Sequence, residues 1–172
     1  IVSGTFFWSL TMVKSGIIYS FGMGFWGANG HDGVWHISLI NSLSRGSFEM
    51  PIFAGSNIKN YHLGFDLLVS FIHKITQIPV VNLYFQILPP IFALLIGITS
   101  YLFVYEWKKS HKAALWATFF VYFGGEISWI FGKGESTFWS QQSVSTLINP
   151  PFALSLIFIF VGLYFLLKRK PI

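Results

Sequence analysis

Three long runs of apolar residues dominate the hydrophobic pattern of the chain. They cover residues 80–105, 113–131 and 150–167. A helix needs roughly 20 consecutive apolar residues to cross the hydrocarbon core of a bilayer, and each run reaches or approaches that length. Residues 1–14 are also apolar but too few to span, so we expect them to be the end of a first membrane helix. The pattern predicts an all-α, polytopic integral membrane protein with about three full transmembrane helices and a partial N-terminal one.

The segment between these runs, residues 15–79, has a different pattern. Apolar residues recur at helical spacing in two short stretches, 36–43 and 61–75, which is typical of amphipathic helices. Short amphipathic helices next to a membrane usually lie in the plane of its interface. We therefore expect residues 15–79 to be a long outer loop that carries interfacial helices, inside one membrane domain covering residues 1–172.

Composition supports a membrane protein and excludes several other classes. Of the 172 residues, 53% are hydrophobic and 10% are charged, whereas soluble domains carry about 25% charged residues. The charged fraction is too small for a soluble enzyme or a nucleic-acid-binding domain, and the hydrophobic fraction is too large for a disordered chain. Because the chain has no cysteine, disulfides, thiolate metal sites and cysteine nucleophiles are excluded as well.

The net charge of +5 is divided unevenly, and its distribution predicts an orientation. Residues 106–112 carry +2 and residues 168–170 carry +3, whereas residues 15–79 and 133–149 are each neutral. Short basic segments that flank membrane helices stay in the cytoplasm. We therefore expect an integral protein of the plasma (inner) membrane, with its basic turns cytoplasmic and the 15–79 segment outside.

The strongest local motif is Asn-Gly-His-Asp-Gly-Val-Trp-His at residues 29–36. Asp32 and His36 are four residues apart, so a helix that starts near Asp32 places both side chains on one face. A carboxylate and an imidazole together can act as a base and its orienting group, or as two ligands of a divalent metal ion. Alternatively, Asp32 is the N-cap of that helix and satisfies its free N–H groups.

A second acid–imidazole motif follows at residues 61–73. His62, Asp66 and His73 fall on one stripe of a helix. The stripe could face a site shared with Asp32, or it could face water, which is the simpler interpretation for His73. If His36, His62 and Asp66 join Asp32, the four could hold a divalent metal ion, although no spacing requires a metal or another cofactor.

Two further polar features lie near the end of the second apolar run. Glu126 could face an aqueous cavity, as acids in membrane helices usually do, or it could pair with Lys133 at the interface. The polar stretch 140–146 could line a hydrophilic cavity or be a plain loop.

This layout resembles the GT-C superfamily of membrane glycosyltransferases. Members have a first membrane helix, a long outer loop with an acidic motif near its start, interfacial helices, and then closely spaced membrane helices. Residues 30–36 look like the acidic motif, residues 53–66 look like the aromatic segment before the next interfacial helix, and residues 107–115 look like the cytoplasmic turn. Many members carry two adjacent acids in the motif, whereas here Gly33 follows Asp32. Because the chain starts with Ile1 rather than Met, we interpret it as an internal fragment from the N-terminal part of such a protein.

The resemblance implies an enzyme that transfers a hexose or pentose, with inversion, from a polyprenyl-phosphate donor to an acceptor at the outer face. Its partners would be the lipid bilayer and the lipid-linked sugar, with no nucleic acid. Asp32 matches the catalytic acid, and His36 is the second candidate catalytic residue. A cation must neutralise the leaving phosphate, and Arg45 and Lys59 lie in the right segment. The candidate substrate-binding residues are His31, Arg45, Lys59, Tyr61, His62, Asp66 and Glu126.

Two other functions remain open. In a transporter or channel segment, Glu126 and the acid–imidazole pairs would line a polar path, and Pro89 and Pro90 would break a membrane helix beside it. In a non-catalytic membrane subunit, the same residues would have no chemical role. Most polar candidates lie in the outer loop rather than within the apolar runs, and this placement favours the transferase.

Overall fold

The computed structural model describes residues 1–125 and 142–169, which form two compact units. One is Met12–Pro89, here called the loop unit, and the other combines Ile1–Thr11 with Pro90–Ile172, here called the helix unit. Each is described separately. The described residues are mostly helical, as the hydrophobic pattern predicts.

Among the described residues, two helices are long and apolar enough to cross a membrane. Val80–Lys108 has 29 residues and Pro150–Lys168 (α9) has 19. They confirm the helices predicted over residues 80–105 and 150–167. The longer one is assembled from α4 (Val80–Asn82), a π-helical segment η2 (Leu83–Ile87) and α5 (Leu88–Lys108).

The widened π-helical turn has a cause in the sequence. Pro89 and Pro90 follow it after one residue, Leu88, and a proline both lacks the N–H that would bond one turn back and crowds the carbonyl found there. The side chain of Gln86 points out of the widened turn, where its Nε2 donates to the carbonyls of Val13, at 3.3 Å, and Ser15, at 2.6 Å. The irregular turn therefore fixes the start of the loop unit against the long helix.

The predicted third span, residues 113–131, is confirmed only as a shorter helix in its described part. α6 runs over His111–Phe123 and has 13 residues, which is too few to cross a bilayer. It starts at an N-cap, Ser110, whose side chain accepts from the amide of Ala113, and it ends where Gly124 adopts an extended conformation. Glu126 and the rest of this run lie outside the described residues.

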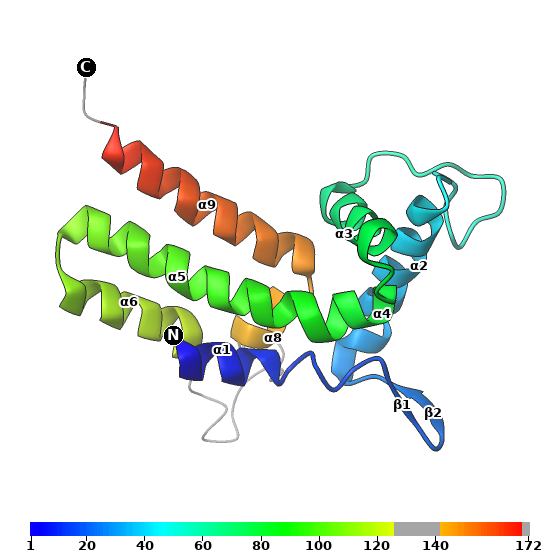
Figure 1. Ribbon diagram of the computed structural model, residues 1–172, viewed down its shortest axis with the longest axis horizontal. Coiled ribbons are helices and arrows are strands. Elements are labelled where there is room, and N and C mark those ends of the chain that lie inside the picture. The colour runs from blue at the N-terminus through cyan, green and yellow to red at the C-terminus, as the bar shows by residue number, and fades with distance from the viewer. Residues whose placement is uncertain (126–141, 170–172) are drawn as a thin grey trace. The chain divides into compact units, whose positions relative to one another are not determined.

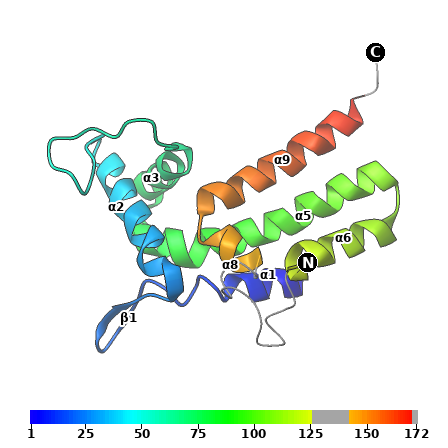
Figure 2. The same ribbon diagram turned by 180° about the vertical axis from the view of Figure 1, so that it is seen from behind.

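The helix unit is held together around one tyrosine. α1 (Val2–Ser9), α6 and α8 (Gln142–Leu147) pack against one another (Figure 2). The backbone carbonyl of Tyr122 on α6 accepts from Trp8 Nε1 at 2.8 Å, and the Tyr122 hydroxyl donates to the carbonyl of Ala93 at the same distance. The Tyr122 ring lies against Gly4 and Gly97, which have no Cβ to keep it away. Small residues allow such close approach between membrane helices.

The loop unit pairs two helices that the amphipathic pattern predicts. α2 spans Asp32–Ser44 and α3 spans Gly64–Thr76, and the two pack side by side in Figure 1. Their shared core is apolar and includes side chains that are almost fully buried: Leu39, Ile40, Phe65, Val69, Leu83 and Phe85. Asp32 and Asp66 stand in the first turns of the two helices, where a negative charge is favoured by the helix dipole.

A short β-hairpin departs from the predicted all-α fold. β1 (Ile17–Tyr19) pairs antiparallel with β2 (Gly22–Gly24), and a 3-10 turn (Gly27–Gly30) follows before α2. Gly16 and Gly22 have positive φ angles of 72° and 123°, which side chains with a Cβ rarely adopt. Strands of three residues give almost no periodic signal, so a pattern search misses them.

Candidate functional site

A histidine and an aspartate form a buried pair between the two helices of the loop unit. His36 Nδ1 on α2 lies 2.7 Å from Asp66 Oδ1 on α3, and the side chains are 5% and 0% exposed. The His36 ring stacks on Tyr84, with ring centres 5.9 Å apart, and meets the edge of Phe65. Burial of a carboxylate is costly unless a partner compensates its charge, so this pair fastens α2 to α3.

The same pair leaves polar atoms uncompensated beside it. Asp66 Oδ2 and the Tyr84 hydroxyl are both buried, and neither has a hydrogen-bond partner within the part of the chain that the structure describes. A buried polar atom without a partner costs about 1–3 kcal/mol. The polar centre of the loop unit is therefore built around the hydrogen bond between His36 and Asp66. Asp66 Oδ2 and the Tyr84 hydroxyl could each make a further hydrogen bond.

Asp32 lies at the exposed N-terminal end of α2. Its carboxylate Oδ1 is 2.7 Å from His31 Nδ1, and the side chains of Asp32 and His31 are 45% and 90% exposed. The N-cap position belongs to His31, which makes no side-chain capping bond. The interpretation of Asp32 as the N-cap is therefore wrong: Asp32 is the first helical residue, and its carboxylate is accessible to solvent.

A second cross-connection joins two aromatic side chains near Asp32. Trp35 Nε1 donates to the Tyr61 hydroxyl at 2.8 Å, and the Tyr61 ring stacks on His62 with centres 4.4 Å apart. Partial burial raises the pKa of Tyr61, the carboxylates of Asp66 and Asp32 raise it further, and the Trp35 hydrogen bond opposes them. Tyr61 therefore lies within the electrostatic influence of the carboxylates of both acid–imidazole pairs.

A cavity opens beside the N-terminal end of α2. It has a volume of about 510 Å³ and is lined by Gly30, His31, Val34, Trp35, Ser38 and Ile52. The lining is mainly apolar, and it includes His31, whose imidazole is bonded to Asp32. The cavity therefore has the Trp35 indole in its lining and the accessible Asp32 carboxylate nearby.

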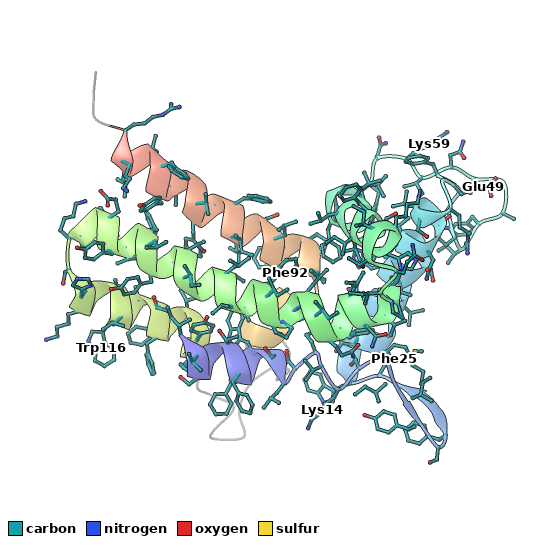
Figure 3. The ribbon with its side chains drawn as sticks, viewed as in Figure 1. Lys14, Phe25, Glu49, Lys59, Phe92 and Trp116 are labelled. Carbon is teal, nitrogen blue, oxygen red and sulfur yellow. The ribbon has the colours of Figure 1, made fainter. Side chains whose placement is uncertain are left out.

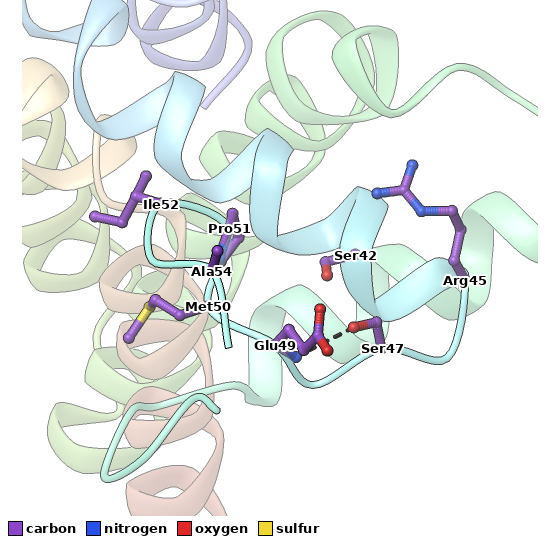
Figure 4. Close-up of a pocket in the computed structure, with 8 residues that line it drawn as sticks. All are labelled: Ser42, Arg45, Ser47, Glu49, Met50, Pro51, Ile52 and Ala54. Atoms are coloured by element: carbon purple, nitrogen blue, oxygen red, sulfur yellow. Dashed lines mark hydrogen bonds between the residues drawn. The ribbon is translucent and has the colours of Figure 1, made fainter. Parts of the chain in front are cut away.

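A second cavity, of about 610 Å³, lies at the other end of α2 and is more polar (Figure 4). Its lining includes Arg45, Ser47 and Glu49, and Ser47 Oγ accepts from the backbone N–H of Glu49 at 3.2 Å. Figure 4 shows the Arg45 side chain extending away from Glu49. Lys59 is exposed in the same connecting loop (Figure 3).

The structure separates residues that the sequence interpretation placed together. Asp32 bonds to His31, whereas His36 bonds to Asp66. The prediction of one helical stripe with His62 is wrong, because α3 begins at Gly64 and His62 precedes it. His73 is on the helix but bonds through Nδ1 to the carbonyl of Ile78 at 2.7 Å.

A metal centre built from these groups finds no geometric support. Within residues 1–125 and 142–169, no three His, Asp or Glu side chains gather closely enough to hold a metal ion. The candidate set Asp32, His36, His62 and Asp66 is divided between an exposed pair, a buried pair and one exposed imidazole stacked on Tyr61.

Two residues of the site were not singled out by the sequence. Trp35 stands in the motif at residues 29–36 but was given no chemical role of its own, and Tyr84 fell inside a predicted span. Both carry a polar group on an apolar ring, and such side chains usually find a partner when buried. The available signal for Tyr84 was a tyrosine within an apolar run, in a chain that also has two acid–imidazole motifs.

Comparison of the chain with protein-family models, curated proteins and solved structures finds no match in any of the three.

Proposed function

We propose that the protein is a membrane glycosyltransferase of the GT-C type, which moves a sugar from a polyprenyl-phosphate donor to an acceptor hydroxyl at the outer face of the membrane. The observation that carries the proposal is the accessible Asp32 carboxylate at the start of α2, next to a cavity walled by Trp35. A general base must reach the proton that it removes. Asp66, the other acid of the loop unit's helices, is fully buried.

The proposed reaction uses Asp32 as the general base. Its carboxylate takes the proton of the acceptor hydroxyl while the acceptor oxygen bonds to the anomeric carbon of the donor. The bond between that carbon and the phosphate oxygen breaks, and its electron pair leaves with the polyprenyl phosphate. Because the acceptor attacks opposite the leaving group, the anomeric configuration inverts. His31, bonded to Asp32, holds the carboxylate in place.

The leaving phosphate needs positive charge. Arg45 and Lys59 are exposed cations of the loop unit, and we propose them as its electrostatic partners. His36 then has a positioning role, because it is buried and bonded to Asp66 rather than to Asp32. The Trp35 and Tyr61 rings offer apolar faces against which the C–H face of a sugar ring can pack.

The exposed surface of α3 supports a location at the membrane interface. Its apolar side chains Leu67, Leu68, Phe71 and Ile75 are 38–65% exposed, whereas its polar Asp66 and Ser70 are buried. The buried face of α3 also contains Phe65 and Val69, so the helix is apolar on both sides, and its exposed apolar face is unfavourable in water. Contact with lipid would cover these side chains and place the loop unit beside a membrane-bound donor.

The transporter alternative draws on the irregular turn at Leu83–Ile87, because broken helices often form transport sites. In this chain Gln86 of that turn donates through Nε2 to the carbonyls of Val13 and Ser15, and the turn's other polar group, the Tyr84 hydroxyl, is buried. The turn therefore has a packing function, and it supports transport less than Asp32 supports transfer.

The proposal can be tested with membranes that contain the full-length protein and with matched membranes that lack it. Both are supplied with radiolabelled polyprenyl-phosphate hexoses and pentoses, and the release of polyprenyl phosphate and the label in non-donor products are measured. The proposal predicts protein-dependent release and an equal gain of label in product. If no donor is consumed in excess of the control, the transferase assignment is wrong.

A further inference from the structure

The β-hairpin of the loop unit has an apolar tip with no covering element within its unit. Ile18 and Phe21 are 79% and 80% exposed, and Ile17, Tyr19 and Met23 are each more than 40% exposed. An isolated two-stranded hairpin is at best marginally stable in water. Exposed aromatic and branched side chains at such a tip are an additional cost, which contact with an apolar phase would remove.

The base of the hairpin, in contrast, is held firmly. The backbone N–H of Trp26 donates to Ser15 Oγ at 3.0 Å, and the carbonyl of Ser15 accepts from Gln86. Phe25 packs edge-on against the buried ring of Phe85, with ring centres 5.9 Å apart. The hairpin thus projects from an anchored base (Figure 3 labels Phe25 there), so its tip has a defined direction rather than being a loose loop.

Both faces of the hairpin are apolar, and this decides what can cover it. Ile18 pairs with Met23, and paired residues point to the same face of the ribbon. Ile17 and Tyr19 point to the opposite face, where Phe21 stacks on Tyr19 with parallel rings 5.2 Å apart. A protein partner or a second copy would cover one face of a ribbon, whereas lipid surrounds both faces and the turn.

The charge of the segment around the hairpin also favours lipid as its covering. Residues 12–31 contain no acidic side chain and one cation, Lys14, which is exposed immediately before the hairpin. A cation next to aromatic side chains suits the level of anionic headgroups. The chain also contains two helices apolar enough to cross a membrane, so a bilayer is the apolar phase to expect.

We infer that the hairpin tip, residues 17–23, docks into the headgroup and upper acyl region of the membrane. Its depth is limited by the strands themselves. The outer edges of a two-stranded ribbon carry backbone N–H and C=O groups without sheet partners, and hydrocarbon cannot satisfy them. The tip therefore inserts its side chains at the interface and does not cross the bilayer.

The absence of cysteine from the chain allows a direct test. Ile18→Cys and Phe21→Cys, one on each face of the hairpin, are each labelled with an environment-sensitive fluorophore, and Ser56→Cys in the exposed connection between α2 and α3 supplies a reference. The proteins are reconstituted into vesicles of phosphatidylcholine and phosphatidylglycerol. Emission is then quenched either by aqueous iodide or by lipids brominated near the headgroup or near the bilayer centre.

The inference predicts that labels at positions 18 and 21 resist iodide relative to position 56. It also predicts quenching of both labels by bromolipids, more strongly by the shallow than by the deep bromines. Iodide access at both positions would overturn it. Lipid quenching at one position alone, or protection from iodide without lipid quenching, would indicate a protein partner or a second copy and overturn it too. None of these outcomes depends on sugar transfer.

Discussion

His36 Nδ1 lies 2.7 Å from Asp66 Oδ1 at the centre of the loop unit, across the packed helices α2 and α3 and 30 residues apart in sequence. The helix that carries His36 also carries Asp32 at its exposed first turn. The buried pair therefore fixes the helix whose end bears the accessible acid. In this way a structural contact determines the position of the proposed catalytic group.

His36→Ala should destabilise the protein strongly, because it leaves the Asp66 carboxylate buried without its partner. Leaving a buried polar group without its hydrogen-bond partner costs about 1–3 kcal/mol, and more for a charged group. Thermal unfolding of the purified protein in detergent measures the loss. The matched control is His31→Ala, which removes the exposed partner of Asp32 and should cost about 0.5 kcal/mol or less. Equal effects of the two substitutions would contradict the assignment of His36 and Asp66 as a buried pair.

Trp35→Phe should raise the pKa of Tyr61 further. The Trp35 hydrogen bond opposes the effects of burial and of the two carboxylates, so its removal leaves those effects unopposed. Phenolate absorbance, taken as a difference against Tyr61→Phe, measures this pKa. Trp116→Phe, which changes an exposed indole, should leave it unchanged. An unaltered or lower Tyr61 pKa in Trp35→Phe would show that the hydrogen bond does not act as described.

The raised Tyr61 pKa also predicts a pH dependence of stability. The folded protein holds the phenolic proton more tightly than the unfolded chain, whose tyrosines titrate near pH 10. The contribution of the protonated Tyr61 to the stability of the fold is thus fully present below about pH 10 and is lost as the pH rises through the folded-state pKa. The free energy of unfolding can be measured from pH 8 to 11, a range of about three units around the ordinary tyrosine pKa. It should fall less at alkaline pH in Tyr61→Phe than in the unaltered protein. An identical pH profile in both proteins would refute this contribution.

Gly33→Ala should destabilise the loop unit, because a Cβ at Gly33 would lie 2.5 Å from Phe85 Cζ, and Phe85 is fully buried. Overpacking of this kind costs about 1–3 kcal/mol. Gly64→Ala is the matched helix substitution, since nothing lies within 4 Å of its added Cβ. It should stabilise by about 0.4–1 kcal/mol. Chemical denaturation of both variants tests the pair, and a neutral Gly33→Ala would contradict the close packing of α2 on Phe85.

The helices of the loop unit could be predicted from the sequence, but not the burial of Asp66 against α2. The helical spacing identifies Leu67, Leu68, Phe71 and Ile75 as one apolar face, and it assigns Asp66 to the polar side. The structure buries Asp66 and exposes those apolar residues, because Asp66 has a partner on α2. Periodicity tells which residues share a face, but it does not tell what covers that face.

The candidate site shows the same limit. Asp32, His36 and Asp66 were all chosen from local motifs, yet their pairing depends on a contact between residues 30 positions apart. The spacing of Asp32 and His36 on one helix suggested that they act together, whereas each bonds to another residue. The hairpin escaped prediction because its turns rest on the positive φ angles of Gly16 and Gly22 rather than on periodicity.

The most direct test of the central claim is sugar transfer by Asp32→Asn, in protein shown by unfolding to be as stable as the unaltered protein. The carboxylate is removed and its shape is kept, so binding should change little, while kcat should fall about 100-fold or more. Glu106→Gln, in the basic turn, controls for the loss of one acidic group and should transfer normally. Transfer by Asp32→Asn at the rate of the unaltered protein would contradict the role of Asp32 as the catalytic base.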